Sequence, residues 1–158
     1  MFDIIVIGGG PAGVTAALRA RELGASVALV ERGDLGGTCT NDGCAPTRVL
    51  AKAARLSRDT RQHALYGLEG NHPTLNWERL LARTQAVVNT LHEKKQLLYH
   101  LHESGVEVFL HAGDAHFTSA HAIELADGTT LSGKKFILCV GGRARRLTFP
   151  GAEHALTH

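Results

Sequence analysis

The stretch FDIIVIGGGPAG, residues 2–13, decides the fold of this chain. Its apolar and largely β-branched part, Phe2–Ile7, predicts a strand that is buried on both faces of a parallel sheet. The strand leads directly into Gly8, Gly10 and Gly13, which have the spacing Gly-x-Gly-x-x-Gly. Glycines with this spacing between a strand and a helix are typical of a turn that binds the phosphates of a dinucleotide.

The elements that follow fit the same interpretation. The apolar positions after Gly13 predict a helix that Gly24 can end. A second strand is expected at Ser26–Val30, and Glu31 follows it directly. The free N–H groups at the start of the helix favour a pyrophosphate, and an acid after the second strand can hold a ribose hydroxyl pair. Arg32 would suit a 2′-phosphate, but Glu31 argues against that ligand.

A second informative stretch, GGTCTNDGCAPTR, covers residues 36–48 and contains Cys39 and Cys44. Five residues of regular helix rise about 7.5 Å, whereas cysteines with Cα atoms more than about 7 Å apart are not bridged without backbone movement. A disulfide between them needs a turn or a distorted helical turn, which the Asn-Asp-Gly before Cys44 tolerates. Pro46 suits the opening turn of a helix, and a thiolate at such a start is stabilised by the helix dipole.

Three functions are open to this pair of cysteines. A structural disulfide is disfavoured because no other paired cysteines and no secretory signal accompany it. A zinc site needs two further ligands, and the ten histidines are scattered without ligand spacing, so that no metal site is expected. Reversible redox chemistry is favoured over both.

Composition limits the remaining possibilities. With 158 residues and 44% hydrophobic content, one domain is expected. The net charge of +2 gives no argument for a nucleic acid or an acidic membrane as partner. Basic residues such as Arg19, Arg21, Lys94 and Lys95 are interpreted as solvated helix faces. Since Met1 leads directly into a strand pattern, without a charged leader or a long apolar run, a cytosolic protein is expected.

The rest of the chain predicts further helices and then strands. A helix is expected at Thr47–Thr60, a connection at Tyr66–Asn76, and one long amphipathic helix from Trp77 to about Gly105, with exposed histidines. Short strands are expected at the positions Val106–Leu110, Ala115–Thr118, Ala122–Leu125 and Thr129–Leu131, with a hairpin turn at Asp127-Gly128. A separate buried strand at Lys135–Val140 would contain Cys139 as a packed core thiol.

Residues 36–46 match the pattern Gly-Gly-Thr-Cys-x-Asn-x-Gly-Cys-x-Pro without a gap. With the glycine fingerprint before it, the chain resembles the flavoprotein pyridine nucleotide-disulfide oxidoreductases, a family that includes dihydrolipoamide dehydrogenase, glutathione reductase and mercuric reductase. The resemblance extends over the whole chain, because Gly113–Phe117 and the last strand into Gly141 also resemble parts of the family's FAD domain. It implies an α/β, Rossmann-like FAD-binding domain with a parallel sheet, flanking helices and a small antiparallel β-meander.

The resemblance also implies roles for individual residues. Cys44 matches the thiol that forms a charge-transfer contact with the flavin, and Cys39 matches the interchange thiol that attacks the substrate disulfide. Gly8, Gly10, Gly13 and Glu31 would hold the ADP half of FAD, Thr38 would lie near the pyrophosphate and the flavin, and the backbone of Ala115 would meet the adenine. Other expected contacts to FAD are made by Pro11, Ala12, Arg32, Gly37, Arg48 and Gly141.

Some positions depart from the family pattern. Arg48 stands where a lysine is usual, so that the positive charge is kept on a planar and bulkier head. Val140 replaces a usual threonine and lacks a hydroxyl near the cofactor. The greatest departure is length, because family members continue with a nicotinamide-binding domain and a C-terminal dimerisation domain. Residues 1–158 are therefore expected to be the N-terminal part of the FAD-binding domain of a longer chain, and unable to turn over alone.

The implied function is a cytoplasmic, flavin-dependent disulfide oxidoreductase of cell redox homeostasis. NAD(P)H would reduce FAD, and electrons would pass through the Cys39–Cys44 disulfide to a small-molecule or protein disulfide, a dithiol or a metal ion. The full-length protein would be a homodimer. One alternative is a non-catalytic FAD- or NAD-binding module with an idle cysteine pair. A flavin oxidase or monooxygenase of the same nucleotide fold is a second alternative, against which the unbroken cysteine motif argues.

Overall fold

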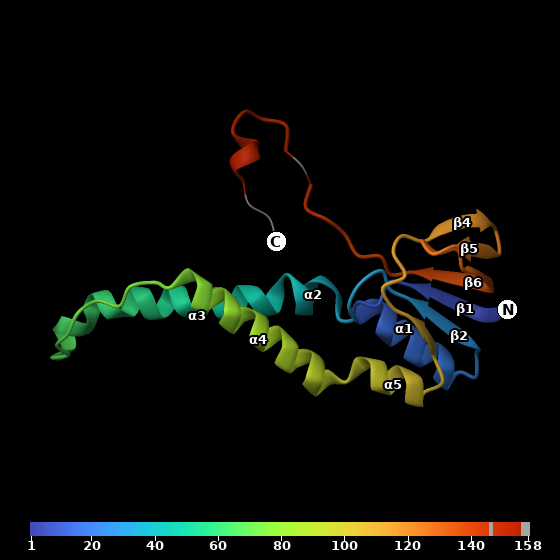
Figure 1. The fold of residues 1–158 in the computed structure, drawn as a ribbon, viewed down its shortest axis with the longest axis horizontal. Helices are drawn as coiled ribbons and strands as arrows, with labels where there is room; N and C mark the ends of the chain where they lie inside the picture. Colours follow the sequence, from blue (N-terminus) through green and yellow to red (C-terminus); the bar gives the residue numbers. More distant parts are fainter. Residues whose placement is uncertain (146, 156–158) are drawn as a thin grey trace. The chain divides into compact units, whose positions relative to one another are not determined.

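The computed structural model describes residues 1–145 and 147–155. The chain divides into two compact units. The first contains residues 1–38 and the chain from Gln96 onward, and the second is Cys39–Lys95. Figure 1 shows the first unit as a sheet with helices and the second as a pair of helices.

The first unit is built on a six-stranded sheet with the order β3-β2-β1-β6-β5-β4. β1 pairs in parallel with both β2 and β6, and β2 pairs in parallel with β3. β6, β5 and β4 form an antiparallel meander. The α/β fold class with a parallel sheet, flanking helices and a small meander is thus confirmed. The strands are β1 (Phe2–Ile7), β2 (Val27–Val30), β3 (Glu107–Phe109), β4 (His116–Ser119), β5 (Ala122–Glu124) and β6 (Thr130–Leu138).

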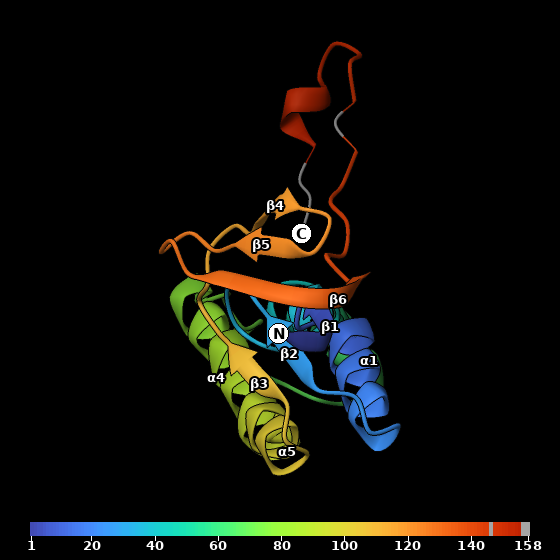
Figure 2. The same cartoon turned by 90° about the vertical axis from the view of Figure 1, so that its right-hand side faces the viewer.

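The two faces of this sheet are buried against different elements, because successive side chains of a strand point to opposite faces. On one face, Val6 and Leu29 pack with α1 (Pro11–Glu22) and with Leu101 of α5 (Leu97–Glu103). On the other face, Ile5 packs with residues of the meander, among them Ile123. Figure 2 shows α1 and α5 on one side of the parallel strands and β4 and β5 on the other. The near-continuous apolar sequence of β1 is therefore explained by burial on both faces.

The predicted separate strands at residues 129–131 and 135–140 are in fact one strand, β6. Its first part pairs with β5 and its second part pairs with β1, so that it joins the meander to the parallel sheet. Gly133 lies between the two parts, and a Cβ there would be 2.8 Å from Cγ1 of Ile5. The predicted strands ended at Leu131 and began again at Lys135, which left Gly133 outside both. Here the glycine instead allows β6 to approach β1 closely.

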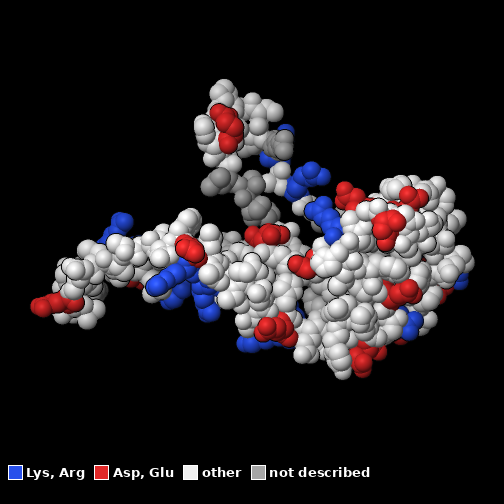
Figure 3. Space-filling view, viewed as in Figure 1, with Lys and Arg blue, Asp and Glu red and all other residues white. Residues whose placement is uncertain are grey.

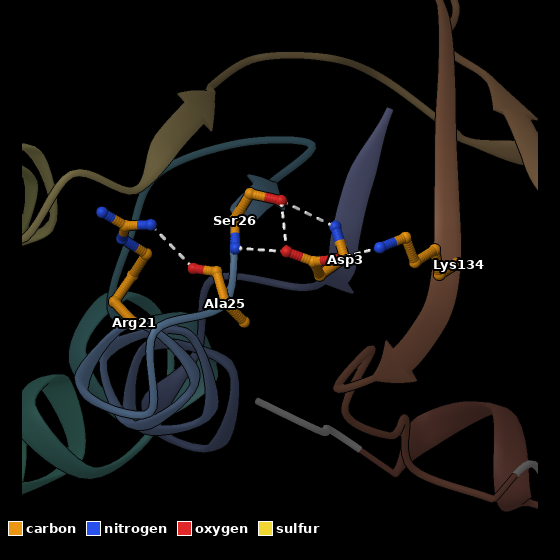
Figure 4. Close-up of polar contacts among 5 residues, drawn as sticks. All are labelled: Asp3, Arg21, Ala25, Ser26 and Lys134. Carbon is orange, nitrogen blue, oxygen red and sulfur yellow. Dashed lines mark hydrogen bonds and ion pairs between the residues drawn. The ribbon is translucent and has the colours of Figure 1, made fainter.

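A polar network joins β1, β6 and the residue before β2 near the start of β1 (Figure 4). The Asp3 carboxylate accepts hydrogen bonds from the backbone N–H of Ser26 at 2.8 Å, from its hydroxyl at 2.7 Å, and from Nζ of Lys134 at 2.7 Å. The Lys134 hydrogen bond and those from Ser26 hold the pKa of Asp3 well below its usual range. Arg21, expected to be a solvated helix residue, donates to the carbonyls of Ala25 and Ser104.

Replacing Asp3 by Asn is expected to lower the melting temperature at neutral pH. A carboxyl with a depressed pKa in the folded state stabilises the fold above its unfolded pKa and loses this contribution as the pH falls. The difference from the wild type should therefore narrow below about pH 4, the ordinary range of an aspartate. Thermal denaturation of both proteins from pH 7 to pH 2 measures this difference in melting temperature. Asp114→Asn is the matched control, since the Asp114 side chain is 96% exposed, and an equal effect of both variants would contradict the role of the network.

The second unit consists mainly of two helices that pack against each other, α3 (Cys44–Asp59) and α4 (Trp77–Lys95). The short helix α2 (Gly37–Asn41) crosses the division between the units, and the 3-10 helix η1 (Thr60–Tyr66) follows α3. α3 begins at Cys44, three residues before the predicted start. No residue of α3 is buried, and only Val88 of α4 is. Large apolar side chains of this unit are exposed, among them Leu65, Tyr66, Leu68, Leu75 and Trp77.

The prediction of one long helix from Trp77 to Gly105 is wrong. The helix is interrupted at Gln96, whose φ of 44° is left-handed, so that α4 ends at Lys95 and α5 begins at Leu97. α4 packs on α3, whereas Leu101 of α5 is fully buried in the core of the first unit. Apolar periodicity continues through such a break, because it records which positions are buried and not which partner buries them.

Two further predicted features are present, whereas the predicted burial of the strand at Lys135–Val140 is wrong, because Lys135, Leu138 and Val140 are exposed. Gly24, with a φ of 85°, follows α1. The hairpin at Asp127-Gly128 is present, with the carboxylate of Asp127 accepting from the N–H of Thr129 at 2.9 Å. A short 3-10 helix, η2 (Ala152–His154), lies near the C-terminal end. No helix within the described residues is both long enough and apolar enough to cross a bilayer.

Candidate functional site

The turn between β1 and α1 depends on two close approaches of one backbone to another. Gly8 has a φ of 107°, and a Cβ there would lie 2.2 Å from the carbonyl oxygen of Cys139. A Cβ on Gly13 would lie 1.7 Å from the carbonyl oxygen of Gly8. Both distances exclude any side chain, so the tight turn and the close helix packing predicted for these glycines are confirmed. The result is that the N-terminus of α1 lies directly after the carboxyl end of β1.

The N-terminus of α1 is open to an anionic ligand. Its N-cap residue, Gly10, supplies no side-chain hydrogen bond, and Pro11 occupies the first turn. A Cβ on Gly10 would meet only the Cα of Gly37, at 3.7 Å, whereas a Cβ on Gly37 would be 2.9 Å from the Cα of Gly10. The backbones of two glycines thus pass each other beside the free N–H groups of the helix. This arrangement fits a pyrophosphate, which needs N–H donors and close backbone approach.

Glu31 directs its carboxylate toward the same turn. Oε2 accepts from the N–H of Gly9 at 2.6 Å, and Oε1 accepts from the N–H of Gly33 at 2.9 Å. A carboxylate offers about four acceptor positions, so that both oxygens keep capacity for the hydroxyls of a ribose. The residues present therefore fit the adenosine diphosphate half of FAD.

The other expected FAD residues of the first unit lie in varied environments. Ala115 is half-buried and packs against the core cluster beneath the meander, and Gly141 has a φ of 70° just after β6. Arg32 is exposed, with Asp114 at 4.0 Å. Pro11, Ala12 and Thr38 are exposed. Cys139 lies one residue after the end of β6 and packs half-buried against the core, and its N–H donates to the carbonyl of Ile7 at 2.7 Å.

The cysteine pair lies where one helix ends and another begins. Cys39 is in α2, which ends at Asn41, and Cys44 is the first residue of α3. Gly43, the N-cap residue of α3, has φ −112° and ψ −99°, which is far from helical. The predicted distortion between the cysteines is therefore present. Both thiols are free and exposed, and they are joined by a hydrogen bond.

The two thiols influence each other's protons. The hydrogen bond with Cys44 raises the pKa of Cys39, and partial removal from water and the charge of Cys44 act in the same direction. The positive charges of Lys95 and Arg48 oppose this rise. The proton of Cys39 is thus held by Cys44 and opposed by two positive charges, while Cys44 is the first residue of α3.

Two basic residues of this site were not predicted from the sequence. Nζ of Lys95 donates to the hydroxyl of Thr40 at 2.9 Å, and Nε2 of His92 lies 2.8 Å from Oδ1 of Asn41. The acceptors lie between the two cysteines in the sequence, about fifty positions from their partners. No local pattern marks such a pair, and both basic residues were interpreted as exposed helix positions. Among residues 1–145 and 147–155, no cluster of His, Cys, Asp and Glu is arranged to hold a metal ion.

Comparison with known proteins identifies the family. Residues 2–158 match the family described as pyridine nucleotide-disulphide oxidoreductase. The chain belongs to this family. Its relatives include a dihydrolipoyl dehydrogenase of Zymomonas mobilis, 37% identical over 148 residues, and a glutathione reductase of Yarrowia lipolytica, 34% identical over 171 residues. A mercuric reductase of Lysinibacillus sphaericus is 30% identical over 152 residues.

These alignments cover nearly all of this chain but only part of each relative. They span 92%, 98% and 96% of the chain, and 31%, 35% and 27% of the dihydrolipoyl dehydrogenase, the glutathione reductase and the mercuric reductase. The chain thus spans about a third of the length of the curated relatives it matches. The chain matches relatives with three different names at similar identity. The comparison therefore assigns the family and does not select one substrate.

Replacing Gly13 by Ala is expected to destabilise this chain strongly, because the added methyl would overlap the Gly8 carbonyl. Overpacking at a site without room costs about 1–3 kcal/mol or more. The free energy of unfolding in urea measures the loss. Gly142→Ala is the matched control, since a Cβ there meets nothing within 4 Å. A fully stable Gly13→Ala variant would contradict the described packing.

Replacing Cys44 by Ala is expected to lower the pKa of Cys39, because the largest cause of its rise is removed while Lys95 and Arg48 remain. Cys39 would then become a thiolate at lower pH. The pH profile of iodoacetamide alkylation, followed at the Cys39 peptide by mass spectrometry, should move to lower pH. The profile of Cys139 in the same sample is the internal control. An unchanged Cys39 profile would show that the two thiols do not interact.

Proposed function

We propose that the chain is the FAD-binding, disulfide-bearing part of an NAD(P)H-dependent flavin disulfide reductase. The observation that carries this proposal is the pair of exposed cysteines, Cys39 and Cys44, on either side of a break between two helices, in a chain of this family. The non-helical backbone at Gly43 supports this proposal, because a regular helix through both cysteines would keep them too far apart for a disulfide. Both sulfurs are also exposed and so accessible to a substrate.

The residues of the first unit are proposed to bind the cofactor. Gly8, Gly10, Gly13 and Glu31 would hold the adenosine diphosphate half, as the open helix start and the Glu31 carboxylate support. The other proposed contacts to FAD are those of Pro11, Ala12, Arg32, Gly37, Thr38, Arg48, Ala115 and Gly141. When bound, FAD supplies the two electrons, received from NAD(P)H, that reduce the Cys39–Cys44 disulfide to two thiols.

The dithiol is proposed to reduce the substrate by thiol–disulfide exchange. The Cys39 thiolate attacks one sulfur of a substrate disulfide, so that a mixed disulfide forms and the first substrate thiolate leaves and takes up a proton. The Cys44 thiolate then attacks the sulfur of Cys39, which restores the Cys39–Cys44 bond and releases the second substrate thiol. Two electrons pass to the substrate. The exposed Cys39 thus acts as the interchange thiol and Cys44 as the thiol that resolves the mixed disulfide.

The complete protein is proposed to contain a nicotinamide-binding domain and a dimerisation domain after this part. It would act as a homodimer in the cytoplasm on a disulfide, dithiol or metal-ion substrate. This follows from the family and from the third of its relatives' length that the chain spans. The 158-residue chain alone is accordingly expected to bind FAD and to carry the disulfide without completing a catalytic cycle.

Spectroscopy and thiol titration of the purified chain test this proposal. An oxidised flavin spectrum is expected, together with one reactive thiol among the three cysteines in the oxidised protein. Anaerobic reduction by one two-electron equivalent should then expose two further thiols. An idle cysteine pair in a nucleotide-binding module would show no reductant-dependent change.

The Cys39→Ser and Cys44→Ser variants are the matched controls. Each should bind FAD and show the same thiol count before and after reduction, because neither can form the disulfide. A reductant-dependent gain of two thiols in either variant would contradict the assignment of the disulfide to this pair. A chain without any flavin after purification and after incubation with FAD would contradict the cofactor assignment.

A further inference from the structure

The segment between the two cysteines is held by the last turn of α4. Thr40 accepts from Nζ of Lys95, and Asn41 lies within hydrogen-bond distance of His92. Lys95 and His92 are three residues apart and so lie on one face of the helix. The hydroxyl of Thr40 belongs to a side chain that is only 2% exposed. The ammonium group of Lys95 is thereby anchored one residue from Cys39.

The C-terminal end of α4 places Lys95 favourably for this contact. Lys95 is its final residue, and the left-handed Gln96 ends the helix directly after it. A positive charge at the C-terminus of a helix is favoured by the helix dipole. Lys94, its neighbour in the sequence, makes no hydrogen bond or ion pair among those found in the described residues, although it carries the same charge.

We propose that Lys95 is a positioning residue that keeps a positive charge beside the Cys39 sulfur through its hydrogen bond to Thr40, and so favours the thiolate that attacks the substrate. Only a thiolate is an effective nucleophile in disulfide exchange. Cys44 opposes the loss of the Cys39 proton, so that a fixed opposite charge is needed to offset it. This consequence for the reaction rests on the proposed function, but the effect on Cys39 does not.

The charged and titratable groups that act on Cys39 come from two helices. From α3 these are Cys44 and Arg48, and from α4 the group is Lys95. His92 on α4 faces Asn41, two residues from Cys39. The second unit also carries more Lys and Arg than Asp and Glu, and several of the basic side chains gather around the middle of the helical pair in Figure 3. A specific effect of Lys95 must therefore be separated from this general positive charge.

The experiment compares Lys95→Met with Lys94→Met in the 158-residue chain. Both variants remove one lysine charge and keep an unbranched side chain. In Lys95→Met, the alkylation profile of Cys39 with iodoacetamide should move to higher pH by about half a unit or more, which lowers the rate at neutral pH about threefold. Lys94→Met should leave the profile unchanged. Lys95→Arg keeps the positive charge, so its profile should lie close to that of the wild type.

Thr40→Val separates the anchor from the charge. It removes the acceptor and keeps Lys95, so a smaller shift in the same direction is expected, with an unchanged circular dichroism spectrum. It also keeps the proposal testable if Lys95→Met fails to fold. An unshifted profile in Lys95→Met, or an equal shift in Lys94→Met, would overturn the proposal.

This test and that of the proposed function fail independently. Alkylation of reduced Cys39 needs neither FAD nor turnover, whereas the proposed function is judged by flavin binding and by the reductant-dependent thiol count. A shift in Lys95→Met with an idle cysteine pair would support the electrostatic role and reject the redox function. A redox-active pair with an unshifted profile would reject only the role of Lys95.

Discussion

The sheet unit depends on the contact of three backbone segments at the first turn. The carbonyl of Gly8 lies where a Cβ of Gly13 would be, and the carbonyl of Cys139 lies where a Cβ of Gly8 would be. These contacts fix the start of α1 against the ends of β1 and β6. Because helix, central strand and last strand meet here without side chains between them, the free N–H groups of the helix remain available to a ligand. The close packing of this turn and the open start of the helix thus depend on the same two glycines, Gly8 and Gly13.

The positions of the two cysteines depend on a break between two helices and not on close backbone packing. A continuous helix through residues 37–59 would separate the two sulfurs, whereas the break at Asp42 and Gly43 brings them into hydrogen-bond contact. The same break makes Cys44 the first residue of α3. One local distortion therefore sets the positions of both cysteines.

Nearby charged groups also act on the proton of Cys39. The raised pKa of Cys39 has its origin in Cys44, and the opposing charges come from Arg48, one turn along α3, and from Lys95 at the end of α4. The reactive state of Cys39 thus depends on groups far apart in the sequence.

The sequence by itself determined the strand–turn–helix of the nucleotide site, the distortion between the cysteines, the fold class and the family, because each depends on residues close together in the chain. Glycine spacing, apolar periodicity and the cysteine motif express backbone sterics that act locally. Only the tertiary structure decided that β6 is one strand across Gly133, that Gln96 ends α4, and that Lys95 and His92 hold the segment between the cysteines. Each of these depends on a partner from elsewhere in the chain: Ile5 for Gly133, the separate packing of α4 and α5 for Gln96, and Thr40 for Lys95. Local propensity carries no information about such partners, which is the physical reason that sequence reasoning treated these residues as a gap between two strands, a helix interior and a solvated surface.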